Sequence, residues 1–260
     1  MPWVIIDHRP LESLSPAAAL VLLATLYRAN YLRRNALVID LMIPSVPGPR
    51  DLLGQIGYYR YCSNVEWRSP EVSPRYFLEH RKGTKVQTGV AEEICQTFTD
   101  EAIGGRGKMQ RLYEALIEGM GNAEEWGYGK KPGGYQMWWV IAYRNDASGE
   151  IGYSFYDQGN GIPATIRRKR TWSEYLPFMS PKDSELVIRG VVEGRFSRTK
   201  IMGRGTGLPR LLKFIDDGAD GELLIFSDRC RCVFKHGRAP EKGDYSIALR
   251  GTLISWSFRP

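Results

Sequence analysis

Two side chains in a helical pattern carry the first chemical signal of the sequence. Glu118 and Asn122 are four residues apart, so a carboxylate and an amide share one face of the predicted helix. A carboxylate there could orient or deprotonate a water molecule, and an amide oxygen is a hard ligand of the kind that magnesium takes. Exposed polar residues of an ordinary helix can have the same spacing, so the pair needs support from other segments.

A second segment combines a carboxylate with a sharp turn. Asp157 ends an apolar run, and Gly159, Gly161 and Ile162 follow it. A carboxylate at a strand end can accept a hydrogen bond from an exocyclic amine such as N6 of adenine. The glycines allow the backbone to turn sharply and to approach a flat base. The alternative is an ordinary turn at the end of a strand.

A third segment is rich in glycine and precedes a predicted helix. Its residues are Gly203, Arg204, Gly205, Thr206, Gly207 and Leu208. Successive backbone N–H groups in such a loop can surround a phosphate. It is not a P-loop, because the sequence contains no Gly-Lys-Ser/Thr, and it fits the dinucleotide fingerprint poorly, because it does not follow a strand in a βαβ unit.

The order of these segments resembles that of the motifs in the GHKL superfamily, the Bergerat-fold ATPases. Glu118 to Ala123 resembles the N-box of that family, Asp157 to Ile162 its first glycine box, and Gly203 to Leu208 its second. Thr252, which follows Gly251 at the start of the last predicted strand, matches the threonine that supports the base. Three motifs in the right order and context favour a shared nucleotide site over coincidence.

The resemblance covers about residues 84–260 and implies a domain that binds ATP and Mg²⁺. It implies an α/β fold of the α+β two-layer sandwich type, a mixed sheet with helices on one face. Glu118 is the implied catalytic residue and Asn122 the implied metal ligand. Residues 162–202, between the glycine boxes, would form a lid over ATP, with residues 197–200 close to the γ-phosphate. The implied nucleotide-binding residues are Asp157, Gly159, Gly161, Ile162, Gly203, Arg204, Gly205, Thr206, Gly207, Leu208 and Thr252.

The preceding residues, 1–75, predict a small β-α-β-α module. Ser15 and Pro16 are typical of a helix start, as N-cap and first helical residue. The module weakly resembles the STAS-like fold of anti-sigma-factor antagonists in Trp3 to Asp7, in the helix from Ser15 and in Leu52 to Gly57. The phosphorylatable serine of that family would fall near Ser15 or Pro16, and a proline there favours a docking role over a phosphate relay. The expected elements of the module are a strand at 3–6, a helix from Ser15, a strand at 36–41 and a helix at 50–58. The later expected elements are helices at 84–99, 106–122 and 210–216 and strands at 136–143, 151–156, 222–226, 230–235 and 252–258.

The composition is that of a globular chain with a basic surplus. The net charge of +7 attracts polyanions, which include nucleotides, nucleic acids and acidic partner proteins. No apolar run is long enough to span a membrane and no signal peptide is evident, which predicts a cytoplasmic protein without a membrane partner. Cys230 and Cys232 alternate on one side of a predicted strand, which favours packing over zinc binding.

Several functions are compatible with this nucleotide site. The favoured one is a Mg²⁺-dependent ATPase that acts as a conformational switch for a partner protein in bacterial signalling or defence; a homodimer is one option. The alternatives are an anti-sigma-like serine/threonine kinase, a non-catalytic nucleotide-gated binding module, and a nucleic-acid-binding protein with ATP as co-ligand. An autophosphorylating histidine kinase is disfavoured, because His80 lies in a short segment without a second long helix beside it.

Overall fold

A computed structural model describes most of the chain. The described residues are 3–68, 75–98, 105–127, 135–168, 181–194, 207–215 and 220–259. Within them, the helices are α1 (Pro16–Leu32), α2 (Pro47–Gln55), η1 (Tyr58–Tyr61), α3 (Thr88–Gln96), α5 (Arg106–Asn122), η2 (Ala123–Gly127), α6 (Ile162–Arg167), α8 (Asp183–Val192) and α9 (Gly207–Lys213). The strands are β1 (Trp3–Asp7), β2 (Val38–Met42), β3 (Arg75–Phe77), β4 (Arg81–Gly83), β5 (Trp138–Asn145), β6 (Glu150–Asp157), β7 (Asp220–Lys235) and β8 (Glu241–Arg259).

The larger sheet has six strands in the order β3-β5-β6-β8-β7, with β4 also paired to β5. Every pairing that the structure describes in this sheet is antiparallel, so the expectation of a mixed sheet is wrong for this part of the chain. The physical reason lies in the short connections β5–β6 and β7–β8, because strands joined by a tight turn pair antiparallel and parallel neighbours need a long crossover. The parallel pair β1–β2 forms a separate sheet.

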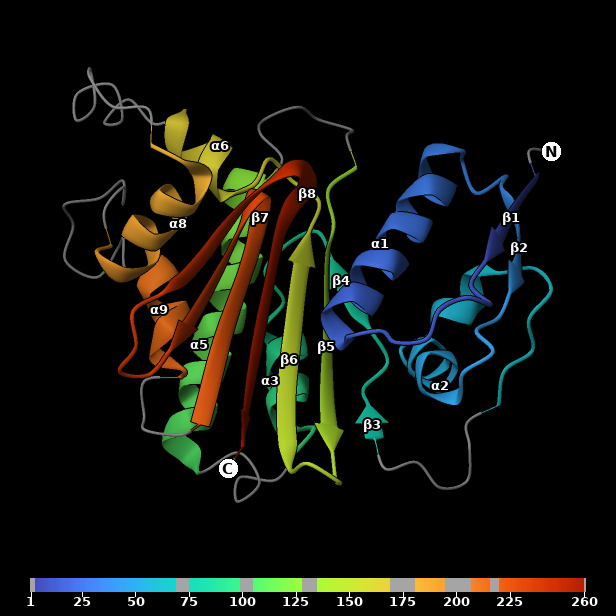
Figure 1. Ribbon diagram of the computed structural model, residues 1–260, viewed down its shortest axis with the longest axis horizontal. Coiled ribbons are helices and arrows are strands. Elements are labelled where there is room, and N and C mark those ends of the chain that lie inside the picture. Colours follow the sequence, from blue (N-terminus) through green and yellow to red (C-terminus); the bar gives the residue numbers. More distant parts are fainter. Residues whose placement is uncertain are drawn as a thin grey trace.

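One face of the large sheet is covered by α3, α5, α8 and α9, as expected for a two-layer α+β sandwich (Figure 1). Along α5, Leu112, Leu116 and Met120 are fully buried at helical spacing. They pack in one apolar cluster with Trp138 of β5 and Phe155 of β6. This packing fixes α5 along the sheet, and its last turn therefore lies beside the end of β6.

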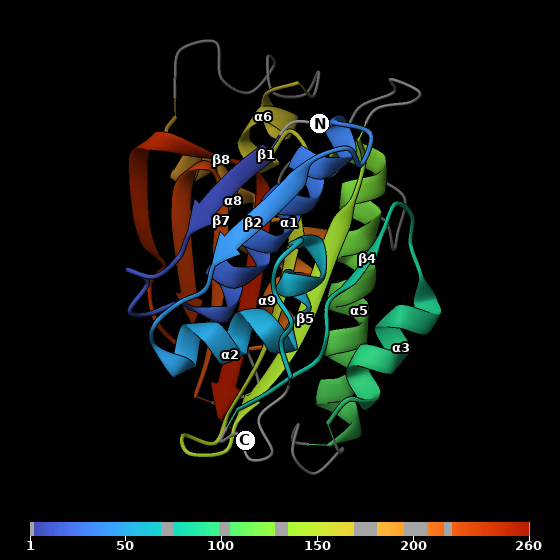
Figure 2. The same cartoon turned by 90° about the vertical axis from the view of Figure 1, so that its right-hand side faces the viewer.

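The opposite face of the sheet is covered as well, by α1, so the expectation that helices lie on one face only is wrong. Leu20 and Leu23 of α1 are fully buried in a second apolar cluster with Trp139 and Tyr156 of the sheet. Figure 1 shows α1 between the large sheet and the β1–β2 pair, and Figure 2 shows the same layers from the side. The N-terminal module and the sheet therefore share an apolar core.

The β-α-β-α order of the N-terminal module is confirmed. Helix α1 starts at Pro16, and the Ser15 side chain accepts a hydrogen bond from the N–H of Ala18, as predicted for an N-cap. The resemblance to a STAS-like fold and the domain boundaries at 1–75 and 84–260 stay predictions.

Two expected strands are one strand in the structure. Residues 222–226 and 230–235 belong to the single strand β7, which shifts register against β8 between Ser227 and Asp228 and between Asp228 and Cys230. The irregularity bends the strand without ending it. From the local sequence, such a bulge is indistinguishable from the end of a strand. Cys230 and Cys232 are fully buried free thiols in the core, which confirms the prediction that they pack.

Candidate functional site

The last two turns of α5 carry the predicted acid and amide. The Asn122 side-chain nitrogen donates a hydrogen bond to Oε1 of Glu118 at 3.2 Å. The other carboxylate oxygen of Glu118 lies 3.8 Å from the guanidinium of Arg210 on α9. Sequence spacing predicted that Glu118 and Asn122 would meet, whereas Arg210 was not singled out as a contact of Glu118, since it belongs to a distant helix.

The surroundings of Glu118 change its acidity. Burial raises the pKa of Glu118 above its ordinary value, and Arg210 and Asn122 oppose part of this rise. Burial disfavours the charged form of a carboxyl group, and a nearby cation favours it. A carboxylate with increased proton affinity is a better general base than an ordinary glutamate.

The chain continues from α5 into the π-helical turn η2, and its last residue touches the second segment. The N–H of Asn160 donates to the carbonyl of Gly127. A β-carbon on Gly159 would overlap that carbonyl, and one on Gly127 would lie 3.5 Å from Oδ1 of Asp157. The close approach requires glycine at position 159 and brings the end of α5 against the Asp157 turn.

Asp157 is a buried carboxyl group at the end of β6. Its exposed fraction is 7%, and its Oδ1 accepts a hydrogen bond of 2.8 Å from the N–H of Gly159. Burial raises the pKa of Asp157 to about 7, although the hydrogen bond from Gly159 opposes the rise. Because the cost of burial is only partly met by this hydrogen bond, a further donor would stabilise the carboxylate.

Thr252 is the residue opposite Asp157 on the neighbouring strand of the sheet. It pairs with Asp157 across β6–β8 and with Ser227 across β7–β8. Gly251, just before it, has a φ of +89°, and a β-carbon there would overlap the carbonyl of Asp157. Glycine is therefore required at this position as well.

Ser227 is a residue of this region that sequence reasoning missed. Its hydroxyl accepts from the N–H of Ile162 at 2.8 Å, donates to the Gly251 carbonyl at 3.0 Å and lies 3.1 Å from the Thr252 hydroxyl. It thereby joins the turn after Gly161 to two strands. No local signal could have identified it, because its importance depends on the register of β7 against β8.

The described site residues therefore fall into one connected group. Glu118 and Asn122 on α5 reach the Asp157 turn through Gly127, and the turn reaches Thr252 through the sheet. Gly207 and Leu208 begin α9, the helix that carries Arg210 to Glu118. The other residues of the predicted phosphate loop, Gly203, Arg204, Gly205 and Thr206, lie outside the described residues. Residues 197–200 lie outside them as well.

The donor set suits a magnesium ion with few protein ligands. The hydrogen bond to Glu118 engages the amide nitrogen of Asn122 and not its oxygen, which is the atom that would bind the metal. Within the described ranges, no cluster of three or more histidine, cysteine, aspartate or glutamate side chains could hold a metal by itself. Magnesium usually keeps several waters and binds one or two protein groups together with substrate phosphates.

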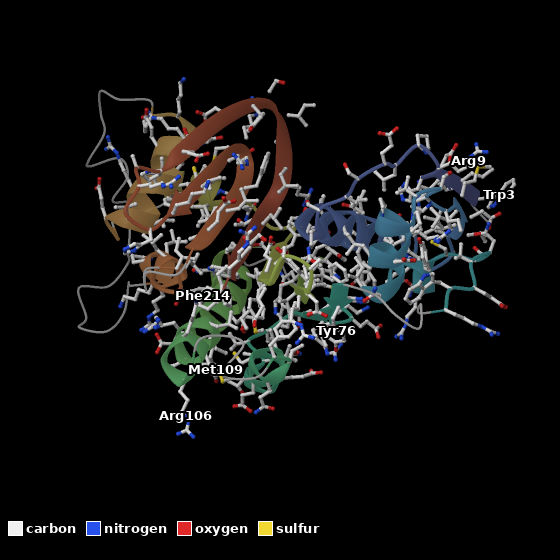
Figure 3. The ribbon with its side chains drawn as sticks, turned by 60° about the horizontal axis from the view of Figure 1, so that its bottom comes forward. Trp3, Arg9, Tyr76, Arg106, Met109 and Phe214 are labelled. Atoms are coloured by element: carbon white, nitrogen blue, oxygen red, sulfur yellow. The ribbon has the colours of Figure 1, made fainter. Side chains whose placement is uncertain are left out.

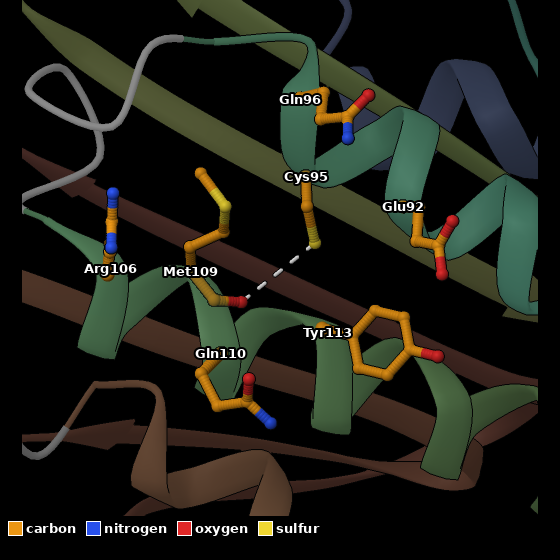
Figure 4. Close-up of a pocket in the computed structure, with 7 residues that line it drawn as sticks. All are labelled: Glu92, Cys95, Gln96, Arg106, Met109, Gln110 and Tyr113. Carbon is orange, nitrogen blue, oxygen red and sulfur yellow. Dashed lines mark hydrogen bonds between the residues drawn. The ribbon is translucent and has the colours of Figure 1, made fainter.

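A separate hollow lies at the opposite end of α5, where it meets α3 (Figure 4). Its volume is about 440 Å³. Figure 3 places Met109 and Arg106 at this end of the molecule, with Arg106 pointing outward. The thiol of Cys95 contacts the carbonyl of Met109 at 3.9 Å, and burial raises the pKa of this thiol to about 12. The lining residues are Glu92, Cys95, Gln96, Arg106, Met109, Gln110 and Tyr113.

Comparisons of the chain with protein-family models and with curated protein sequences gave no match. None of the helices that the structure describes has the length and apolar character needed to cross a lipid bilayer.

Proposed function

We propose that this chain binds ATP with Mg²⁺ and hydrolyses it, and that the nucleotide acts as a conformational switch toward a protein partner. The observation that supports this most is the contact of Gly127 with the Asp157–Asn160 turn. Through it, the chain segment that follows the acid and the amide of α5 contacts the turn that follows a buried carboxyl group at a strand end. Such convergence of polar groups from distant segments is typical of a ligand site.

In this proposal, the base is recognised by the turn after β6. The Asp157 carboxylate accepts from the exocyclic amine of adenine, and that hydrogen bond supplies the donor that this buried group needs. Thr252 supports the base from the neighbouring strand. Gly159 lets the turn pack against Gly127, and Gly161 lets it pack against Ser227 and Gly251, so these glycines fix the shape of the turn that would contact the base.

The reacting end of the nucleotide belongs to α5 and the glycine-rich segment. Glu118 orients the attacking water and accepts its proton, which its raised pKa favours. The side-chain oxygen of Asn122 would hold Mg²⁺, which supplies charge neutralisation for the phosphates when bound. The segment from Gly203 to Gly207 would provide backbone N–H groups for the phosphates.

The test is calorimetric titration of the chain with ATP, with and without Mg²⁺, followed by a phosphate-release assay on the same sample. We expect Mg²⁺-dependent binding and slow release of phosphate. Absence of ATP binding under both conditions would contradict the proposal. Transfer of the γ-phosphate to a protein, instead of its release, would favour the kinase alternative.

A second candidate is a nucleotide-gated binding module without turnover. It is favoured by the contact between Arg210 and the Glu118 carboxylate, because a neighbouring cation reduces the basicity of a carboxylate. Normal ATP binding with no phosphate release, unchanged in Glu118→Gln, would support this function over hydrolysis.

A further inference from the structure

The two edges of the small β1–β2 sheet differ in how their backbone groups are satisfied. Along the outer edge of β2, the Ser63 hydroxyl accepts from the N–H of Ile39 at 3.1 Å, and the Ser63 N–H donates to the Ile39 carbonyl at 2.7 Å. The Asn64 side chain bonds to both the N–H and the carbonyl of Leu41, at 2.9 and 3.3 Å. The edge of β2 is therefore closed by side chains and backbone of the following segment.

The outer edge of β1, by comparison, has no hydrogen-bond partner among the residues that the structure describes. The N–H of His8 donates to the carbonyl of Met42. This bond shows which residues of β1 direct their backbone N–H and carbonyl groups toward β2, because the direction alternates along a parallel strand. Val4 and Ile6 consequently turn their backbone groups toward β2, and Trp3 and Ile5 turn theirs away from it. Natural proteins usually protect such an edge with a lysine, a proline or a covering segment.

The side chains of this edge are apolar and exposed. The exposed fractions are 62% for Trp3, 41% for Val4 and 52% for Ile5. Figure 1 shows β1 at the outer limit of the N-terminal module, and Figure 3 shows Trp3 and Arg9 at its periphery. Parallel strands are normally buried, so an isolated parallel pair with an apolar edge strand is incomplete as it stands.

We propose that β1 pairs antiparallel with β1 of a second copy of this chain, about a two-fold axis at Ile5. The product is a continuous four-stranded sheet in the order β2-β1-β1-β2. Ile5 stands opposite Ile5 of the second copy, and the outward backbone groups of both strands pair with each other. In a two-fold dimer, both subunits contribute the same strand to the interface.

The sequence of β1 fits itself in this register. Val4 faces Ile6 of the second copy and Ile5 faces Ile5, so three consecutive β-branched residues match. Trp3 faces Asp7, whose carboxylate is already neutralised within its own chain by Arg9, with hydrogen bonds of 3.0 and 2.8 Å. No like charges oppose one another along the described strand. We infer a second copy as the partner because the sequence of β1 matches itself in this register.

The proposed interface is small. A strand of five residues offers less than the roughly 800 Å² per partner of a standard stable interface. Met42, exposed on β2 in register with Asp7, adds apolar surface on the far side of Asp7 from Trp3 of the second copy. We therefore expect a dimer that dissociates on dilution.

Cysteine cross-linking tests the register. Directly opposed residues of a hydrogen-bonded antiparallel pair have α-carbons about 5.5 Å apart, within the range that a disulfide spans. Ile5→Cys should give a covalent dimer on mild oxidation, read on a non-reducing gel. Val4→Cys is the matched control, because position 4 faces position 6, and it should stay monomeric on the gel. Equal cross-linking of both variants, or of neither, would overturn the proposal.

Sedimentation equilibrium of the full chain tests the dimer itself. We expect a monomer–dimer equilibrium that Ile5→Lys abolishes, because it places two ammonium groups at the axis. The control is Ile247→Lys on β8, where the isoleucine is 81% exposed and far along the chain from β1. A monomer at all concentrations, or loss of the dimer in Ile247→Lys as well, would overturn the proposal and leave the edge to a different protein.

Discussion

The two ends of α5 offer opposite combinations of shape and chemistry. At its N-terminal end, α5 and α3 line the hollow of about 440 Å³, to which the buried thiol of Cys95 contributes. At its C-terminal end, α5 carries the hydrogen-bonded pair Glu118 and Asn122, and Gly127 in the following turn contacts the Asp157 turn. Helix meets helix at the first end, whereas a helix, a strand end and a tight turn meet at the second.

The two ends of α5 therefore differ in the kind of polar groups they hold as well as in shape. Two packed helices hold their polar side chains at the rim, where water solvates them. At the other end, burial raises the pKa values of the buried carboxyl group of Asp157 and of the half-buried one of Glu118. Perturbed carboxyl groups next to glycine turns favour the C-terminal end of α5 as the place of chemistry.

The largest effect is expected from Glu118→Gln. Phosphate release should fall by roughly 10²–10⁴-fold, the usual contribution of a general base, while ATP binding persists. Glu114→Gln is the matched control, one helical turn earlier on α5, and it should keep full turnover. Persistent turnover in Glu118→Gln would assign the base to another residue.

A glycine substitution tests the close packing at the Asp157 turn. Gly251→Ala should lower the free energy of unfolding by more than about 2 kcal/mol, because its φ is +89° and the new β-carbon overlaps the Asp157 carbonyl. The control is Gly89→Ala on α3, where nothing lies within 4 Å of the new carbon and a gain of about 0.5–1 kcal/mol is expected. Thermal denaturation followed by circular dichroism measures both, and equal stability of the two variants would contradict the close packing at the Asp157 turn.

Asp157→Asn sharpens the assignment of the base. ATP affinity should fall by roughly 10–100-fold, since a hydrogen bond to a charged group contributes about 1.5–3 kcal/mol. Discrimination between ATP and GTP in competition calorimetry should decrease at the same time. Unchanged discrimination would place the base contact elsewhere.

The same carboxyl group predicts a pH dependence of stability. The pKa of Asp157 is raised from 3.8 to about 7, so between these values the folded state holds a proton that the unfolded state releases. The contribution of this group to stability is therefore present at low pH and is lost as the pH rises toward and past 7. Denaturant unfolding at pH 5 and pH 8 should show a smaller decline in Asp157→Asn than in the natural chain; an identical decline would contradict the raised pKa.

The smallest effect is expected at the hollow. Glu92→Gln removes a carboxylate that α3 contributes to the lining of the hollow, and it should change neither ATP affinity nor phosphate release. A loss of either activity comparable with that of Glu118→Gln would move the site to the hollow and reverse the comparison.

Much of the fold could be predicted because its signals are local. Ser15 and Pro16 marked the start of α1, and the spacing of Leu112, Leu116 and Met120 marked α5. The joined strand β7 and the antiparallel order of the large sheet could not be predicted in the same way. Both depend on hydrogen bonds between residues far apart in the sequence, and a bulge at Ser227 resembles a chain break.

The sequence by itself determined the chemical groups of the candidate site: an acid and an amide one turn apart on α5, and a carboxylate before a glycine turn. Only the tertiary structure decided that Gly127 joins them, that Ser227 ties the turn to two strands, and that α1 covers the second face of the sheet. The physical reason is that residue types and short spacings set local geometry, whereas burial, strand register and close backbone approach exist only once distant segments have packed together.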